Sequence, residues 1–252
     1  MLKRLFGEDT DSALSYLGED AVSVRIRANL YCYRDNYSFA EFWAQYNDIG
    51  EITAVLSKIN GACTLVFSRD ADTEEIVSLL HFIGFNTLFL DKDKAGILSL
   101  SYSSCGDILV FDKDISTSYD TDSFTDMKIA FSMISENEGD GIAKLDYLEW
   151  LSDFTFKKNR GCARISAINE ETLVSFAMTS AETEKSALIS GVFTDKTKRK
   201  QGFGERALLS LCKSLIEENK KIYIMTAETK MTAYYEKRGF SRCGGWCEIK
   251  GE

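Results

Sequence analysis

The stretch RKQGFGERAL, from Arg199 to Leu208, places basic side chains and glycines at the expected start of a helix. A helix N-terminus offers about four unpaired N–H groups and a partial positive charge, so it attracts phosphate. Gly202 and Gly204 let the backbone approach a ligand, because glycine has no Cβ and readily adopts positive φ. Arg199 and Lys200 add positive charge there. The pattern indicates a site for a phosphate-bearing cofactor.

Two well-known phosphate loops fit this stretch poorly. A Walker loop ends in Gly-Lys-Ser/Thr, and GFGER contains neither the lysine nor the hydroxyl. A dinucleotide fingerprint is met formally by Gly202, Gly204 and Ala207, but its first glycine should follow directly on a strand. Here the polar residues 195–201 lie between the strand and that glycine. The dinucleotide reading stays open as an alternative, to be tested by NAD binding.

The longer stretch VFTDKTKRKQGFGERAL (192–208) resembles the acetyl-CoA loop of the GCN5-related N-acetyltransferase (GNAT) family. The family signature is Arg or Gln, two residues, Gly, any residue, then Gly or Ala, which matches Arg199, Gly202 and Gly204. The resemblance implies that acetyl-CoA is the co-substrate, with its pantetheine arm along the preceding strand and its pyrophosphate on the loop amides. The cofactor-binding residues implied are Val192, Thr194, Arg199, Lys200, Gln201, Gly202, Phe203, Gly204 and Glu205.

A second motif, AYYEKRGF (233–240), resembles the family's Tyr-x-x-x-Gly-Phe segment. Tyr235 matches the general acid that protonates the leaving thiolate of coenzyme A, a transfer that a phenol with a pKa of about 10 can make. Where the family often has a cofactor-binding Asn, this sequence has Glu228, a candidate general base or amine anchor. The structural alternatives are a tyrosine that packs a short helix and a carboxylate that caps a helix or is solvated.

The overall composition restricts the partners. The net charge is -9 with a pI near 4.9, so the protein has no broad electrostatic reason to bind nucleic acid or an anionic membrane. No apolar run approaches the roughly 18–20 residues that cross a bilayer, and the N-terminus turns acidic before a signal peptide could develop. Seven cysteines without repeated pair spacing and a single histidine predict reduced thiols and no metal site. We therefore expect a cytoplasmic protein.

The elements around the motifs predict an α/β protein with a mixed sheet. The divide between two halves falls at the acidic, Ser/Thr-rich stretch 112–126. Expected strands are 37–47, 51–60, 62–68, 86–91, 162–169, 172–180, 186–194 and 222–227, with strand material at 246–249, and expected helices are 72–85, 125–141, 145–161, 203–221 and 230–239. Asn60-Gly61 predicts a tight hairpin, and Glu182 and Glu184 are expected to be solvated in a turn.

The two halves share one order of elements, a weak internal repeat. Where the second half has the glycine loop, the first has RDADTEEIVSLL (69–80), which is acidic and lacks glycine. The resemblance therefore implies two tandem GNAT-like acyl-CoA N-acyltransferase domains. Residues 1–116 would be a degenerate copy without the loop, and residues 117–252 would bind acetyl-CoA.

The function implied is transfer of an acetyl group from acetyl-CoA to an amine of a small molecule or peptide, by direct attack on the thioester. The alternative is a non-catalytic tandem protein that binds coenzyme A or serves as a sensor or interaction module. We expect a monomer or homodimer. The acceptor pocket is expected from the helical region around residues 142–160 and the last hairpin, with the N-terminal domain as a further candidate. Trp150, Phe154 and Phe156 could line it, or could belong to the core as aromatics of an amphipathic helix usually do.

Overall fold

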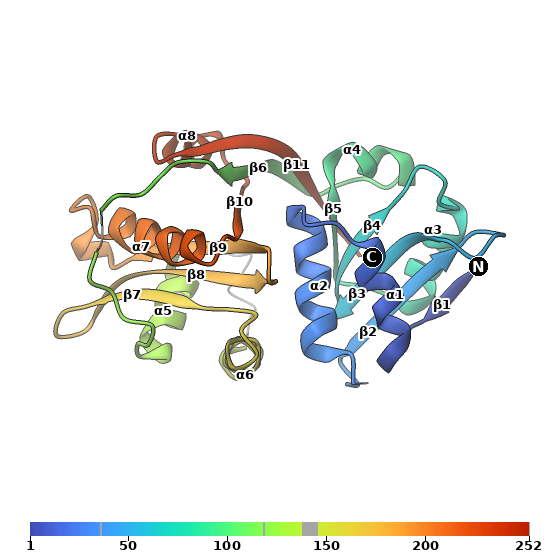
Figure 1. Cartoon of the computed structure of the whole chain (residues 1–252), viewed down its shortest axis with the longest axis horizontal. Helices are drawn as coiled ribbons and strands as arrows, with labels where there is room; N and C mark the ends of the chain where they lie inside the picture. Colours follow the sequence, from blue (N-terminus) through green and yellow to red (C-terminus); the bar gives the residue numbers. More distant parts are fainter. Residues whose placement is uncertain (36, 118, 138–145, 252) are drawn as a thin grey trace. The chain divides into compact units, whose positions relative to one another are not determined.

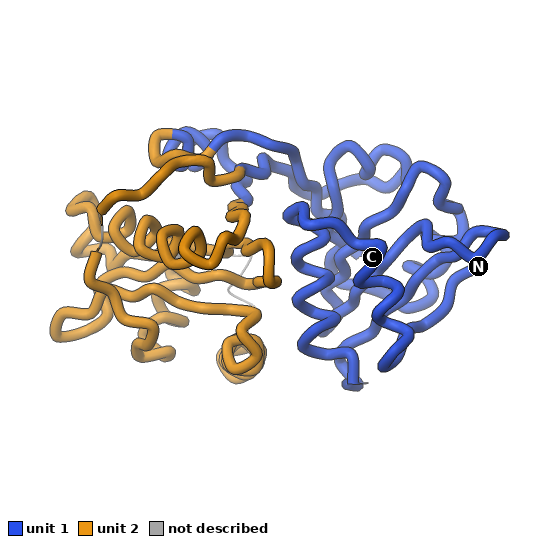
Figure 2. Tube along the Cα trace, viewed as in Figure 1, with its two compact units in different colours: residues 1–109, 225–236, 241–252 blue, residues 110–224, 237–240 orange. Residues whose placement is uncertain are grey.

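The computed structural model describes residues 1–35, 37–117, 119–137 and 146–251, and it has the α/β fold class that the sequence predicts. The chain forms two compact units (Figure 2). Unit 1 comprises Met1–Leu109, Met225–Glu236 and Ser241–Glu252, and unit 2 comprises Val110–Ile224 and Lys237–Phe240.

Unit 1 is built on the strand order β1-β2-β3-β4-β5-β11-β6 (Figure 1). Its strands are β1 (Leu2–Arg4), β2 (Ala40–Tyr46), β3 (Ile52–Ile59), β4 (Ala62–Phe67), β5 (Thr87–Asp91), β6 (Ser104–Phe111) and β11 (Phe240–Lys250). Its helices are α1 (Thr10–Tyr16), α2 (Ala21–Tyr33), α3 (Thr73–Ile83), α4 (Lys92–Ala95) and α8 (Thr229–Glu236), with short 3-10 turns at Gly7–Asp9 and Gly96–Leu98.

The predicted hairpin of unit 1 is confirmed. Strands β3 and β4 pair antiparallel up to Ile59 and Ala62, and the turn residues Asn60 and Gly61 have φ values of 47° and 81°. Positive φ at both central positions is the conformation that Asn-Gly favours in a two-residue turn. The chain then enters α3, whose predicted closure at Gly84 is also present.

The first two helices and β6 were not predicted. The sequence of α2, AVSVRIRANLYCY, has buried residues on most of its surface, so it lacks the one-sided apolar pattern by which a helix is recognised. Its start is nevertheless a local feature, because the Asp20 carboxylate accepts hydrogen bonds from the N–H groups of Val22 and Ser23.

Unit 2 has the strand order β10-β9-β8-β7, antiparallel except for the parallel pair of β9 and β10. Its strands are β7 (Ile165–Asn169), β8 (Leu173–Glu182), β9 (Ser186–Thr194) and β10 (Lys221–Thr226), and its helices are α5 (Met127–Asn137), α6 (Tyr147–Asn159) and α7 (Phe203–Glu217), with a 3-10 turn at Lys196–Lys198. Of the helix predicted over 125–141, residues 138–141 lie outside the described residues, as does residue 145 of the next helix.

The two faces of the unit 2 sheet carry different helices. Helix α7 packs its buried stripe, including Ala207, Leu208 and Leu211, on β7, β8 and β9. Helices α5 and α6 contribute Ile134 and Phe154 to a separate cluster that contains Phe193 and further residues of β7 and β8. The sheet therefore separates the surface that receives the glycine loop from the surface covered by α5 and α6.

The compact units divide the chain differently from the predicted domains 1–116 and 117–252. Residues 225–236 and 241–252 group with the N-terminal residues, because β11 pairs antiparallel with β5 from Trp246 and Asp91 to Lys250 and Thr87. A strand that pairs with a segment so distant in the sequence leaves no local signal of its partner.

A buried ion network holds one end of the unit 2 sheet. Glu182 was expected in a solvated turn, but β8 extends through it and its residue is 1% exposed. Its carboxylate accepts hydrogen bonds from Arg164 at 2.7–3.0 Å, from Lys220 at 2.8 Å and from the Thr179 hydroxyl at 2.6 Å. The expectation was wrong because two cations and a hydroxyl solvate this carboxylate in place of water.

The loss of Glu182 should destabilise the protein strongly. Glu182→Ala removes the buried acceptor of Arg164 and of the nearly buried Lys220 and leaves them only the half-exposed Glu218, so we expect the free energy of unfolding to fall by about 3 kcal/mol. Urea denaturation measures it. Glu184→Ala changes an exposed carboxylate of the same turn and should stay within about 0.5 kcal/mol of wild type. Equal stability of the two variants would refute this role of the network.

The same network makes stability depend on acid pH. Hydrogen bonds from Arg164 lower the pKa of Glu218 to about 2, so its carboxylate stabilises the folded protein above its ordinary pKa, and the contribution is lost as the pH falls toward the folded value. The side chain is 45% exposed, so solvent screening limits the contribution to about 1 kcal/mol. We expect Glu218→Gln to be less stable than wild type at pH 7, and the difference to vanish near pH 2 in urea titrations.

Candidate functional site

Strand β9 loses one of its two neighbours before it reaches the loop. Its parallel pairing with β10 runs from Ser186 and Lys221 to Ile189 and Ile224. Residues 190–194 continue along β8 alone, after register shifts in β8 between Met178 and Ala181. Among the described residues, the backbone of this part of β9 is therefore not paired with β10. Such backbone groups need another partner.

The loop begins with a fixed turn. The Asp195 N–H donates to the carbonyl of Val174 at 2.9 Å, and the Asp195 carboxylate accepts from the Thr197 N–H at 2.8 Å. The hydrogen bonds from Thr197 lower the pKa of Asp195. The chain thus leaves β9 in one direction, and the long polar approach noted in the sequence is an ordered turn.

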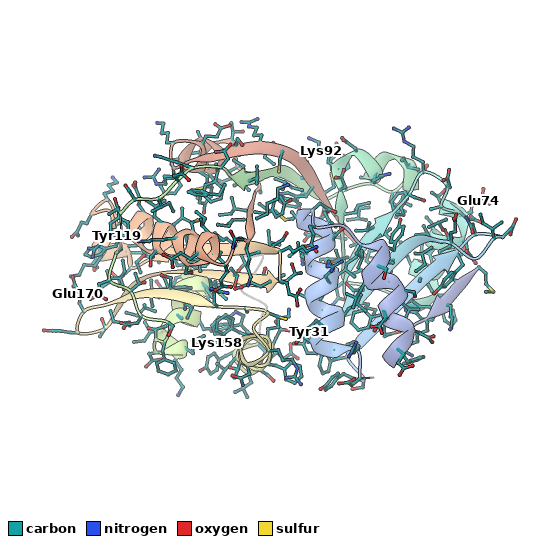
Figure 3. All side chains as sticks on the ribbon, viewed as in Figure 1. Tyr31, Glu74, Lys92, Tyr119, Lys158 and Glu170 are labelled. Atoms are coloured by element: carbon teal, nitrogen blue, oxygen red, sulfur yellow. The ribbon has the colours of Figure 1, made fainter. Side chains whose placement is uncertain are left out.

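Several basic side chains of the loop bind partners within the protein and so fix the position of the loop. Lys196 pairs with Glu136 at 3.1 Å, and Lys198 pairs at 2.7 Å with Glu170, labelled in the turn between β7 and β8 (Figure 3). The Arg199 Nε donates to the carbonyl of Thr194 at 3.4 Å. The exposed Lys200, with a φ of 64°, follows in the chain. The basic cluster therefore shapes the loop as well as making it positive.

Gly202 begins α7 in a conformation that suits glycine. Its φ is 86°, no described side chain caps the helix, and a Cβ built on Gly202 would meet nothing within 4 Å. Helix α3 of unit 1 begins differently, because the Asp72 carboxylate accepts from the Glu75 N–H at 3.0 Å. The start of α3 thus already holds a carboxylate of its own chain, whereas no described side chain caps the start of α7.

Gly204 brings the first turn of α7 against β9. A Cβ at this position would lie 2.9 Å from the Thr194 hydroxyl and 3.6 Å from Val192. The Thr194 hydroxyl also lies 2.9 Å from that of Ser175, whose hydroxyl donates to the carbonyl of Phe193. The structure therefore brings Val192, Thr194 and Gly204, three of the predicted cofactor-binding residues, close together. Ser175 was not predicted, because it lies on a neighbouring strand.

The two sequence motifs meet in unit 2. Arg238 of the second motif donates to Glu205 of α7 at 2.8 Å, and the Phe240 ring packs edge-on against Phe111 with centroids 5.0 Å apart. Arg238 was not singled out from the sequence, although it stands inside the AYYEKRGF motif. The contact positions the end of the second motif beside the first turn of α7.

The candidate catalytic residues lie in unit 1, in or just before α8. Tyr235 is 4% exposed and packs edge-on against Tyr234. Glu228 is exposed, and its carbonyl accepts from the Thr232 N–H at 3.0 Å, which makes it the residue that begins the helix. The Thr232 hydroxyl donates to Asp107 at 2.9 Å. The predicted catalytic residues and the loop thus belong to different compact units.

Other chemistry has little support in the described part of the chain. Cys243 and Cys247 lie in β11, one exposed and one buried, and all seven cysteines are free thiols. Within the described ranges, no group of three or more His, Cys, Asp or Glu side chains could hold a metal ion. The same ranges contain no helix with the length and hydropathy of a membrane span.

Residues 126–240 match the model of the acetyltransferase (GNAT) family. This range contains the loop and both candidate catalytic residues. A search of curated proteins finds no match to this chain.

Solved structures share the fold of the whole chain. A tandem GNAT protein from the clavulanic acid biosynthesis pathway is 14% identical, with a TM-score of 0.62 over 98% of this chain and 97% of its own. A GCN5-related N-acetyltransferase from Sphaerobacter thermophilus is 11% identical, with a TM-score of 0.65 over 99% and 95%. A putative acetyltransferase from Pyrococcus horikoshii is 13% identical, with a TM-score of 0.60 over 100% and 89%. The predicted tandem fold is therefore confirmed.

Replacement of Gly202 should remove the anion site without unfolding the protein. A β-branched residue at positive φ forces the loop to rearrange, so we expect Gly202→Val to weaken acetyl-CoA binding about 100-fold or more, as loss of two charged hydrogen bonds would. Isothermal titration calorimetry measures the affinity. Gly161→Val is the matched control, since Gly161 has a φ of 70° and open space in the same unit. Normal binding by Gly202→Val would contradict this site.

Proposed function

We propose, from the match of residues 126–240 to the acetyltransferase (GNAT) family model, that the protein is an N-acetyltransferase that moves an acetyl group from acetyl-CoA to an amine. The observation that carries the proposal is the start of α7, where Gly202 opens a helix that no described side chain caps. The equivalent start of α3 is capped by Asp72. One acetyl-CoA site is therefore proposed, in unit 2.

The loop residues fit a phosphate-bearing ligand. The amides of residues 201–205 would hold the pyrophosphate, because N–H groups at a helix start attract anions. Lys200 and Arg199 would add charge at the mouth. The part of β9 that is not paired with β10, which contains Val192 and Thr194, would hydrogen-bond the pantetheine arm through its backbone. Acetyl-CoA supplies a thioester whose carbonyl carbon an amine can attack.

The protein would position the two substrates, stabilise the charge that develops on the thioester oxygen and transfer protons. Backbone N–H groups of β9 would stabilise the developing negative charge on the carbonyl oxygen, and positioning of amine and thioester would supply much of the rate. Tyr235 would donate its phenolic proton to the leaving thiolate. Glu228 would accept the proton of the amine or hold the ammonium form. The role of Tyr235 rests on the motif match. Glu228 departs from the family, which often has an Asn at this position, and its role rests on its carboxylate near the end of a strand.

Tests of binding and turnover separate this function from its alternatives. We expect acetyl-CoA to raise the melting temperature and to release free thiol when small primary amines are added. Binding without turnover on any amine would favour the non-catalytic sensor or interaction module. Stabilisation by NAD but not by coenzyme A would favour the dinucleotide-binding alternative.

Replacement of Tyr235 tests the general acid. Tyr235→Phe removes only the hydroxyl, so we expect kcat to fall by about 100-fold or more, while the Kd of acetyl-CoA stays close to that of wild type. Thiol release under saturating substrates measures kcat. Tyr234→Phe alters the adjacent ring and should keep most of the activity. If both variants are equally active, Tyr235 is not the proton donor.

A further inference from the structure

A small cavity lies on the face of the unit 2 sheet that α5 and α6 cover. Its volume is about 200 Å³, the share of six or seven water molecules at about 30 Å³ each. Its lining residues are Ile134, Trp150, Asp153, Phe154, Lys157, Ala163, Met178, Ser180, Ser190 and Phe193. A space of this size accommodates a small molecule.

The cavity reaches the place where β9 loses its neighbour. Ser190 is the first residue of β9 beyond the parallel pairing with β10, and Met178 precedes the register shift in β8. The Ser190 hydroxyl donates to the carbonyl of Met178 at 3.4 Å. Helix α7 and its loop approach this part of the sheet from the opposite face. An amine in the cavity would therefore meet a thioester carried along β9 through the gap in the pairing.

One wall of the cavity is aromatic. The Trp150 and Phe154 rings stack with centroids 5.8 Å apart and an interplanar angle of 7°. Phe131 supports Trp150 at 5.4 Å. Phe156, expected beside them, instead lies under the Arg160 guanidinium at 3.5 Å and does not line the cavity. Stacked rings that line a space of this size favour an apolar group on the ligand.

The polar wall carries an ion pair with its cation on the buried side. Lys157 and Asp153 are 3.1 Å apart, and their side chains are 12% and 39% exposed. An ammonium has three donors, so Lys157 can serve a second oxygen while it keeps Asp153. The charges of Lys157 and Asp153 compensate each other, so the wall offers an ammonium donor to a carboxylate and a carboxylate acceptor to an amine. The cavity therefore pairs an apolar wall with a wall that carries one group of each charge, which suits a zwitterion.

We propose that the acceptor is a free α-amino acid with an apolar side chain, an inference that rests on the proposed acetyltransferase function. The side chain would lie against Trp150 and Phe154, the carboxylate would bind Lys157, and the α-amine would lie near Ser190. The amine nitrogen forms a bond to the acetyl carbonyl carbon and the carbon–sulfur bond breaks. The amine loses one proton and the coenzyme A thiolate gains one, so the products are an N-acetyl amino acid and coenzyme A.

Matched substrates test this class directly. L-phenylalanine and phenethylamine share the ring and the amine, and only the first has the carboxylate. We expect kcat/KM to be at least ten-fold higher for L-phenylalanine than for phenethylamine, and to be low for L-lysine and spermidine. In Lys157→Met, the ratio of kcat/KM for L-phenylalanine to kcat/KM for phenethylamine should fall at least ten-fold. A ratio is independent of the fraction of folded enzyme. Lys128→Met, on an exposed lysine of α5, should leave the ratio unchanged.

The outcomes separate this inference from the function on which it rests. If amines are acetylated but L-phenylalanine is no better than phenethylamine or spermidine, the acceptor class is wrong and the acetyltransferase stands. If no amine is acetylated, L-phenylalanine is titrated into the protein with coenzyme A present, and its binding tests the cavity assignment. Binding that Lys157→Met weakens at least ten-fold supports the cavity assignment, and absence of binding overturns it.

Discussion

The end of the parallel pairing between β9 and β10, at Ile189 and Ile224, is the constraint on which the candidate site depends. Up to this point both strands satisfy each other's backbone groups, and beyond it β9 must find another partner. The paired end is closed by the Glu182 network, in which Arg164 and Lys220 tie the start of β7 and β10 to the end of β8. The sheet is therefore tied by ion pairs at one end, and at the other end β9 is not paired with β10.

In unit 1 a parallel strand pair also ends before its strands do, but there a carboxylate of the chain caps the helix that follows. Its strands β4 and β5 pair in parallel only from Ala62 and Thr87 to Thr64 and Phe89, although β4 continues to Phe67. The helix after β4 is α3, and Asp72 satisfies its first turn. Gln45 fixes Asp72 in turn, since its side chain bonds both the N–H and the carbonyl of Asp72. A carboxylate of the chain thus occupies the position where α7 would receive a phosphate.

Local features of the fold could be predicted from the sequence, and long-range ones could not. The Asn60-Gly61 hairpin and the stripe of α7 depend on neighbours in the chain, and both are present. The burial of Glu182 depends on Arg164 and on Lys220, which lie on separate elements, so no short pattern announces it. In the candidate site, the glycine pattern predicts the start of a helix, and Gly202 does precede α7. The contact of Arg238 with Glu205 could be found only from the three-dimensional structure.

The position of β11 also affects how the protein is made. In unit 1 this strand lies between β5 and β6, and it follows both of them in the chain, so it is synthesised after them. Until then β5 and β6 lack the strand that separates them, and their edges are open to incorrect pairing. Unit 1 can complete its sheet only after β11 has been synthesised. A domain built from one continuous segment could instead fold as soon as that segment is made. A gene fragment that encodes only one half of the chain would therefore not encode the complete sheet of unit 1.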